Sequence, residues 1–164
     1  MKTKKIQLLV ETYESPDALP PEDRELLMLA VKSLADAYAP YSRYRVGASL
    51  RLAGGKTVSA NNQENAAYPS GMCAERIAMF FAKAQYPEAI IETIAIAAQS
   101  GEFIIDRAVS PCGACRQVMA EYQIQQGKDI RVLMKGERGP ILAVNSIDAL
   151  LPMMFHAPEL KKKK

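Results

Sequence analysis

The segment Ile91–Ala98 constrains the fold of this chain more than any other feature, because it is an almost unbroken apolar run rich in isoleucine. A strand with one solvent-exposed face alternates apolar and polar side chains, whereas a continuous apolar run is typical of a strand that is buried on both faces. It is also far too short to span a bilayer. The chain therefore needs other elements that cover this strand.

Helical patterns elsewhere in the sequence supply that cover. Between Glu22 and Tyr38 apolar residues recur at spacings of three and four, which predicts a helix with one buried face that ends before Pro40. Further helices are expected over Cys73–Gln85, from Cys112 to Tyr122, and briefly from Ser146. Strands are expected at Ile6–Tyr13 (a strand or an arm), Val46–Leu52, Lys56–Asn61, Ile91–Ala98, Ile130–Lys135 and Ile141–Val144. This order predicts an α/β fold in which helices cover the faces of one mixed sheet.

The whole chain, residues 1–164, is expected to form one domain, because its length suits a single core and no linker or internal repeat is present. Residues 1–21 are interpreted as an N-terminal arm and residues 161–164 as a lysine tail. The start of the chain lacks a cleavage-like small-residue site, so neither secretion nor membrane insertion is expected.

The formal net charge of +3 comes from the two ends of the chain. The four lysines at 161–164 and the three at positions 2, 4 and 5 supply seven positive charges, so the rest of the chain is mildly acidic. Binding of a nucleic acid polymer would need basic residues interleaved with aromatic ones inside the fold, and the sequence has no such stripe. Three cysteines are an odd number, which argues against a closed disulfide framework and favours a reducing compartment, the cytoplasm.

All three cysteines lie in two short segments, each at the start of a predicted helix: Cys73-Ala74-Glu75 and Pro111-Cys112-Gly113-Ala114-Cys115. Thiolates are preferred zinc ligands, and three protein ligands leave one tetrahedral position for water, as in catalytic zinc sites. Cys112 and Cys115 would share one face of a helix because they are three residues apart. Residues two apart do not, so Cys73 is expected at the helix cap if it serves the same site as Glu75.

Each of these residues also has a plainer interpretation. Glu75 suits a proton carrier beside metal-bound water, whose pKa zinc lowers to about 7, although spacing alone does not exclude it as a fourth ligand. A lone cysteine is often a small buried hydrophobe, and a lone C-x-x-C pair also occurs in redox and structural zinc sites. The two segments together favour a catalytic metal, because they match the zinc-deaminase signature with Cys in place of its His.

Several further motifs resemble, in order, the small homotetrameric cytidine deaminases over roughly residues 26–160. The motifs are Ala39-Pro40-Tyr41-Ser42, Val46-Gly47-Ala48, Asn62-Gln63-Glu64-Asn65-Ala66, Cys73-Ala74-Glu75-Arg76, Pro111-Cys112-Gly113-Ala114-Cys115-Arg116-Gln117 and Leu150-Leu151-Pro152. The resemblance implies a three-layer α/β/α sandwich with a mixed sheet of about five strands. It implies one zinc ion per subunit on Cys73, Cys112 and Cys115, with Glu75 as the proton shuttle while water attacks C4 and ammonia leaves.

The resemblance also implies a set of substrate contacts. Asn62 and Glu64 would hydrogen-bond the ribose, Ala74 would offer backbone groups to the base, and Arg76 would donate to the cysteine sulfurs. Tyr44 and Phe155 take the positions of aromatic residues that pack around the base, Phe155 from a neighbouring subunit; Tyr44 departs from the more usual phenylalanine. Tyr68 matches a residue that reaches across subunits, so a homotetramer is expected whose subunits complete each other's sites. The sole histidine, His156, is expected to be exposed.

These residues predict hydrolytic deamination of cytidine and deoxycytidine in pyrimidine salvage, with a small nucleoside as the substrate. An alternative is deamination of an N4-substituted cytosine nucleoside or a nucleoside antibiotic, because Tyr44 alters the pocket. A third hypothesis makes the zinc structural and the lysine tail a binding element, but such a site has no need of Glu75.

Overall fold

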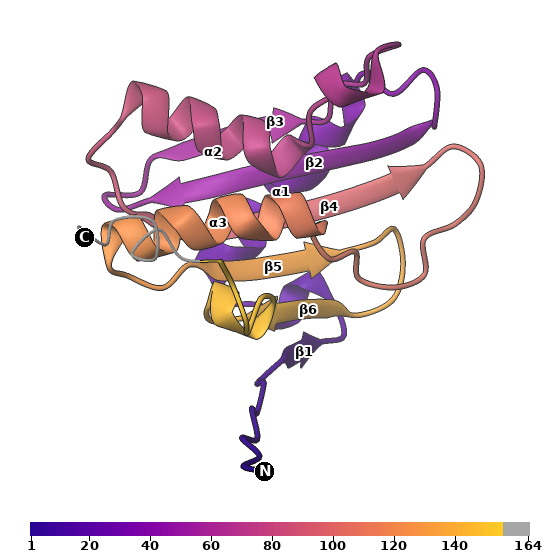
Figure 1. Cartoon of the computed structure of the whole chain (residues 1–164). Helices are drawn as coiled ribbons and strands as arrows, with labels where there is room; N and C mark the ends of the chain where they lie inside the picture. Colours follow the sequence, from indigo (N-terminus) through magenta and orange to yellow (C-terminus); the bar gives the residue numbers. More distant parts are fainter. Residues whose placement is uncertain (156–164) are drawn as a thin grey trace.

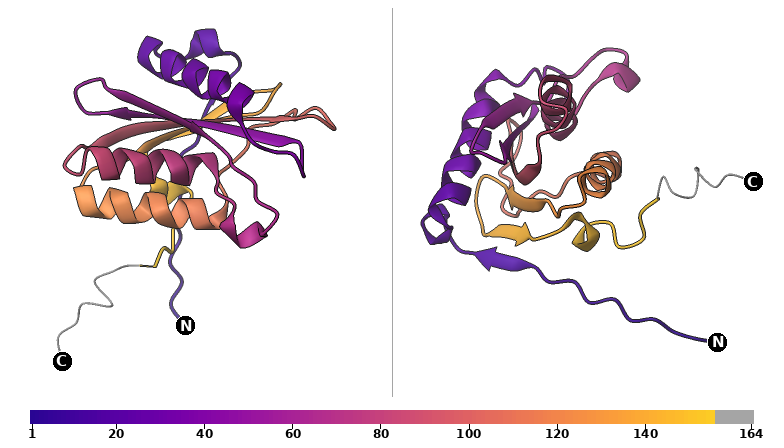
Figure 2. Two further views of the ribbon diagram at one scale, coloured as in Figure 1. Left: turned by 90° about the horizontal axis from the view of Figure 1, so that it is seen from above. Right: turned by 90° about the vertical axis from the view of Figure 1, so that its left-hand side faces the viewer.

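The computed structural model describes residues 1–155 and consists of a mixed six-stranded sheet between two layers of helices (Figures 1 and 2). The strands lie side by side in the order β1-β6-β5-β4-β2-β3. Their bounds are β1 Glu11–Tyr13, β2 Tyr44–Leu52, β3 Thr57–Asn61, β4 Ile91–Ser100, β5 Arg131–Lys135 and β6 Ile141–Val144. The helices are α1 Pro21–Ser33, α2 Ala74–Gln85 and α3 Gly113–Gln126. The predicted α/β/α fold is confirmed, and the sheet has six strands where the resemblance implied about five.

Strand β4 is buried on both faces, as its apolar run predicts. Ala95 and Ala97 pack in one core cluster with α1, while Ile94 and Ile96 pack in a second with α2 and α3. Figure 2 shows the corresponding layers, with α1 on one side of the sheet and α2 and α3 together on the other. The small residues on one face and large ones on the other let two layers of helices approach the same strand.

The sheet brings the starts of α2 and α3 to one edge. Strand β4 pairs parallel with β5 and antiparallel with β2, which in turn pairs antiparallel with β3. Strands β3 and β4 therefore run in the same direction, and α2 follows β3 as α3 follows β4. Ligand sites of open α/β sheets form where such strands end and helices begin.

Helix α1 is shorter than its periodicity predicts, because it ends at Ser33 and a 3-10 turn follows over Leu34–Asp36. The carbonyl of Ser33 accepts a hydrogen bond from the side chain of Asn61 in β3, and the Ser33 hydroxyl donates to Ala30 and Ala60. The Asn61 side chain thus satisfies a carbonyl group at the end of the helix.

The predicted N-terminal strand is also shorter than Ile6–Tyr13. Only Glu11–Tyr13 pair with another strand, antiparallel to Ile141–Ala143 of β6, and the preceding residues are exposed. Predictions for His156 and the lysine tail concern residues outside the described part of the chain. Within residues 1–155, every helix is too short or too polar to cross a membrane.

Candidate active site

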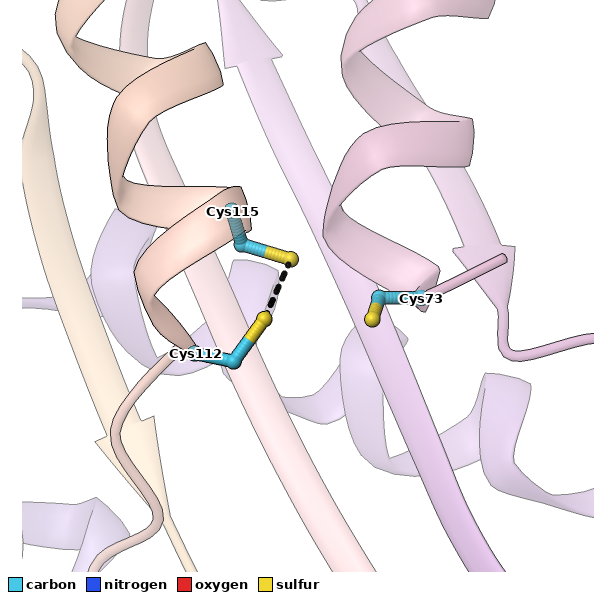
Figure 3. Close-up of side chains that lie close together, drawn as sticks. All are labelled: Cys73, Cys112 and Cys115. Atoms are coloured by element: carbon cyan, nitrogen blue, oxygen red, sulfur yellow. Dashed lines mark hydrogen bonds between the residues drawn. The ribbon is translucent and has the colours of Figure 1, made fainter. Parts of the chain in front are cut away.

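The three cysteines meet where α2 and α3 begin (Figure 3). Cys73 is the N-cap of α2 with extended backbone (φ −72°, ψ 147°), and Cys112 is the N-cap of α3 (φ −67°, ψ 167°). Cys115 lies in the first turn of α3. The three sulfurs lie within 4.8 Å of one another, and those of Cys112 and Cys115 are 3.5 Å apart. The expected position of Cys73 at the helix cap is confirmed.

This cluster fits a zinc ion. Zinc–sulfur bonds of about 2.3 Å place tetrahedral sulfurs about 3.8 Å apart, within the spread of these three atoms. Two helix N-termini direct their positive ends at the sulfurs and favour thiolates. Arg76 adds a positive charge, because its Nη2 lies 3.7 Å from the Cys73 sulfur. Its Nε is buried without a hydrogen-bond partner among the described residues.

The surroundings favour the charged form of one sulfur in particular. The pKa of the Cys73 thiol is lowered to about 5, chiefly because Cys115 donates to its sulfur, with a further contribution from Arg76. The same contact raises the pKa of Cys115, which is fully buried. The contact with Arg76 thus favours a thiolate at Cys73.

Glu75 is a buried carboxylate beside this cluster, with only 5% of its surface exposed. Burial raises the pKa of Glu75, and the nearby charge of Cys73 raises it further. A carboxyl group whose pKa is raised toward neutrality can both accept and return a proton. Glu75 is the buried acidic residue of α2, and it lies beside the cysteine cluster.

A cleft of about 710 Å³ opens over the cysteines. Its lining includes eight of the eleven predicted site residues: Tyr44, Asn62, Glu64, Tyr68, Cys73, Glu75, Arg76 and Cys112. Ala74 and Cys115 are fully buried beneath it. Phe155 does not line the cleft of its own chain: the residue is 56% exposed and its backbone carbonyl accepts a hydrogen bond from Gln117.

Asn62 and Glu64 are fixed at the cleft by hydrogen bonds to the backbone around β2. The Asn62 amide accepts from Val46 N–H at 2.7 Å and donates to the Tyr44 carbonyl at 2.9 Å. Glu64 accepts from the backbone N–H groups of Tyr41 and Ser42 and from the Ser42 hydroxyl. Slight burial raises the pKa of Glu64, but these hydrogen bonds outweigh it, so the pKa is lowered overall.

Sequence reasoning assigned no role to Tyr41 and Ser42, although it identified the motif that contains them. The structure places both in the cleft lining, where they hold Glu64, and the ring of Tyr41 packs edge-on against Tyr68 at 6.4 Å. Sequence reasoning also missed Val109 and Ser110, which line the cleft just before Cys112. Their proximity to Pro111-Cys112 was the available signal. Tyr68 is 77% exposed at the cleft of its own chain.

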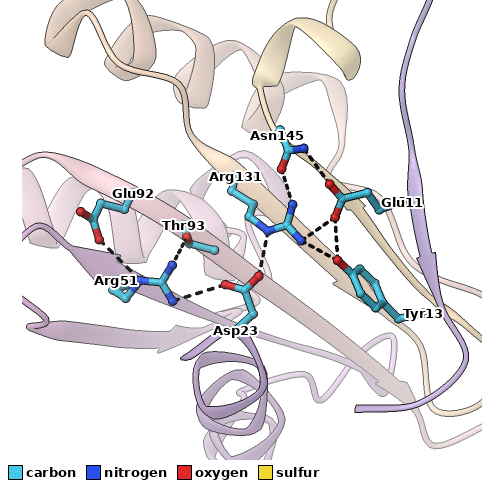
Figure 4. A network of polar contacts seen from close by, with 8 residues as sticks. All are labelled: Glu11, Tyr13, Asp23, Arg51, Glu92, Thr93, Arg131 and Asn145. Carbon is cyan, nitrogen blue, oxygen red and sulfur yellow. Dashed lines mark hydrogen bonds and ion pairs between the residues drawn. The ribbon is translucent and has the colours of Figure 1, made fainter. Parts of the chain in front are cut away.

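A second polar cluster lies away from the cleft and has a structural role (Figure 4). The Asp23 side chain, 4% exposed, accepts hydrogen bonds from Arg131 and Arg51 at 2.8 and 3.3 Å. Arg131 also donates to Glu11 at 2.7 Å and to the Tyr13 hydroxyl at 3.1 Å. The cluster therefore links the N-terminal strand to α1 and to the centre of the sheet, and its buried charges are paired.

Comparison with known proteins gives a consistent result. Residues 20–128 match the family described as the cytidine and deoxycytidylate deaminase zinc-binding region. The chain is 39% identical over 139 residues to a cytidine deaminase of Halalkalibacterium halodurans, covering 84% of this chain and 98% of that relative. It is 28% identical over 137 residues to a blasticidin-S deaminase of Bacillus cereus, covering 82% and 92% of the two chains. The crystal structure of a cytidine deaminase from Burkholderia pseudomallei is similar with a TM-score of 0.68 and 34% identity, covering 80% of this chain and 97% of that one.

Proposed function

The chain belongs to the family that has the cytidine and deoxycytidylate deaminase zinc-binding region, and from that premise we propose that it hydrolyses cytidine and deoxycytidine to uridine and deoxyuridine plus ammonia, with zinc as its cofactor. The observation that carries this proposal is the convergence of three cysteine sulfurs with the buried carboxylate of Glu75 at the base of one cleft. The chain also matches cytidine deaminases over nearly their whole length, and this similarity supports the proposal.

Cys73, Cys112 and Cys115 hold the zinc ion in this proposal. Zinc supplies a lowered pKa for bound water and so makes water a nucleophile near neutral pH. Glu75 moves the protons: one goes to N3 of the cytosine ring and one to the departing amine, so that ammonia leaves from C4. Its raised pKa suits both transfers.

The remaining residues of the cleft bind and orient the substrate. Asn62 and Glu64 form hydrogen bonds with the ribose hydroxyls, because each side chain keeps hydrogen-bonding capacity beyond its backbone contacts. Tyr44 forms a wall for the base or sugar, and backbone groups of Ala74 meet the base. Arg76 acts on the metal ligands through its contact with Cys73.

We propose further that four copies assemble and complete each other's clefts. The exposed ring of Phe155, outside its own cleft, would cover the base in a neighbouring subunit, and Tyr68 would reach across the same boundary. An aromatic group contributed in this way excludes water from the reacting atoms. The three unpaired cysteines suit the cytoplasm, and the reaction belongs to pyrimidine salvage.

The experiment tests a panel of substrates with zinc-loaded protein. Deamination is measured as the loss of cytidine absorbance and as the release of ammonia. Cytidine and deoxycytidine should both be deaminated. A protein that leaves them unchanged but deaminates an N4-substituted cytidine or blasticidin S would instead have the alternative function, which Tyr44 and the 28% identical relative make worth testing. Light scattering should report a tetramer, and a monomer with full activity would contradict shared sites.

A further inference from the structure

One wall of the cleft is a loop rather than a helix or strand. Residues 101–112 connect β4 to α3, and this β4–α3 loop contributes Val109, Ser110 and Cys112 to the cleft lining. Farther back in the loop, the ring of Phe103 packs against Tyr44 at 6.5 Å. The loop therefore contacts the cleft wall at Tyr44, whose own backbone is held in β2.

The loop receives little support from its own backbone. Within the described residues, positions 102–110 take part in one backbone–backbone hydrogen bond. It runs from Arg138 N–H to the Ile105 carbonyl at 3.0 Å. A hollow of about 520 Å³, lined by Tyr44, Phe103 and residues 104–110, lies against the loop. A segment without internal hydrogen bonds beside a hollow depends on contacts from elsewhere for its position.

Arg43 holds the start of the loop, through an ion pair with Glu102 at 2.9 Å and a backbone hydrogen bond from Gly101. The middle of the loop is held by the β5–β6 turn, residues 136–140, and there above all by Glu137. One carboxylate oxygen of Glu137 accepts hydrogen bonds from Ser100 N–H at 3.1 Å and from Ile105 N–H at 3.3 Å. It thus joins the end of β4 to the middle of the loop. A charged acceptor makes stronger hydrogen bonds to N–H groups than a neutral one.

Two glycines of this turn allow the close approach. A Cβ added to Gly136 would lie 2.8 Å from the Ile105 side chain and would also meet the Arg107 carbonyl. Gly139 has φ 77°, and an added Cβ there would meet the Asp106 carbonyl. The turn and the loop are therefore fitted backbone against backbone, with Ile105 buried between them.

We propose that Glu137 is a positioning residue that sets substrate affinity by holding the β4–α3 loop, and with it Phe103, against Tyr44. This inference rests on the proposed function. Glu137 does not line the cleft, so its carboxylate is not among the groups that face the substrate there. Its effect is on how well the Tyr44 wall fits the nucleoside.

The test compares kcat, KM for cytidine and zinc content in Glu137→Ala, Glu137→Gln and wild type. Glu137→Ala should raise KM by about fivefold, with kcat within about twofold of wild type and zinc content unchanged. Glu137→Gln should stay within about twofold in KM, because its amide oxygen still accepts both hydrogen bonds. Glu121→Ala, an exposed change on α3, is the matched control and should match wild type.

A double-mutant cycle separates positioning from a general loss of stability. In a Phe103→Ala background, Glu137→Ala should raise KM by no more than about twofold, because the contact through which it acts is already gone. If Glu137→Ala does not fold, Glu137→Asp keeps the charge but shortens the reach, and its KM should rise by about threefold.

Three results would overturn the inference: an unchanged KM in the Ala or Asp variant, a Gln variant as impaired as the Ala variant, or effects of Glu137 and Phe103 that multiply independently. Wild-type protein that does not deaminate cytidine would overturn the proposed function itself, and the inference with it. Active wild type with an unaffected Glu137→Ala variant would overturn the inference alone.

Discussion

Cys73 and Glu75 are separated by one residue, yet both side chains face the same cleft because the helix starts between them. Cys73 has extended backbone at the N-cap, and Glu75 lies in the first turn of α2. On a continuous helix the two side chains would point in different directions. The helix boundary thus places the proposed metal ligand Cys73 and the proposed proton carrier Glu75 side by side from a segment of three residues.

Glu75→Gln should nearly abolish turnover while zinc stays bound. The amide keeps the size of the side chain but cannot carry a proton, and loss of general acid–base catalysis costs about 10²- to 10⁴-fold. The measurement is cytidine absorbance alongside zinc analysis. Glu25→Gln, exposed on α1, is the control. Wild-type rates in the Glu75 variant would contradict the proposed mechanism.

Removal of zinc should abolish activity and lower the melting temperature. Metal that binds only the folded state stabilises it, because the three cysteine ligands are brought together only there. Chelator-treated protein should regain activity with zinc but not with magnesium, because thiolates select soft metals. Cys115→Ala should lower zinc content in the same assay. Full activity of metal-free protein would exclude the proposed role of zinc.

The sequence predicts the part of the structure that depends on local patterns. Helix α2, the N-cap position of Cys73 and the burial of β4 all follow from spacing and apolar periodicity. The end of α1 does not, because Asn61 in a distant strand takes the Ser33 carbonyl. The contact of Glu137 with Ile105 is likewise a tertiary one between two loops, which residue spacing does not encode.

The pair Glu11–Arg131 should make stability depend on pH. Hydrogen bonds from Arg131 and Tyr13 lower the pKa of Glu11 from 4.5 to about 2. Because the folded-state pKa is the lower one, the stabilisation is fully present above pH 4.5 and is lost as the pH falls toward 2. Glu11→Gln should therefore lower the melting temperature at neutral pH, and the difference from wild type should shrink in acid.

The expected difference at neutral pH is about 2–3 °C, because the Glu11 side chain is 38% exposed and solvent screens the pair. Both proteins are stripped of metal first, so that metal release in acid affects them equally. Glu14→Gln, exposed just after β1, is the control and should keep the wild-type melting temperature at neutral pH. A difference that grows toward low pH would contradict the sign of the shift.

Asp23→Ala should destabilise the fold strongly, by about 3 kcal/mol. The change leaves the guanidinium groups of Arg51 and Arg131, both largely buried, without their shared carboxylate. Chemical denaturation measures the loss. Asp17→Ala is a matched control, because the Asp17–Arg24 pair is exposed and such pairs contribute less than about 1 kcal/mol. Equal losses in the two variants would contradict the structural role of the buried cluster.

Gly47→Ala should weaken the packing of α1 on the sheet, by about 2 kcal/mol. A Cβ at Gly47 would meet the Ala30 carbonyl and lie 2.5 Å from the Ser33 hydroxyl, so α1 would have to move away from β2. Gly113→Ala is the control, because no heavy atom of a neighbouring element lies within 4 Å of its added Cβ. Denaturation of the two variants should show a loss for Gly47→Ala and a change of less than about 0.5 kcal/mol for Gly113→Ala. If Gly47→Ala is as stable as wild type, α1 and β2 do not lie as close in solution as this structure has them.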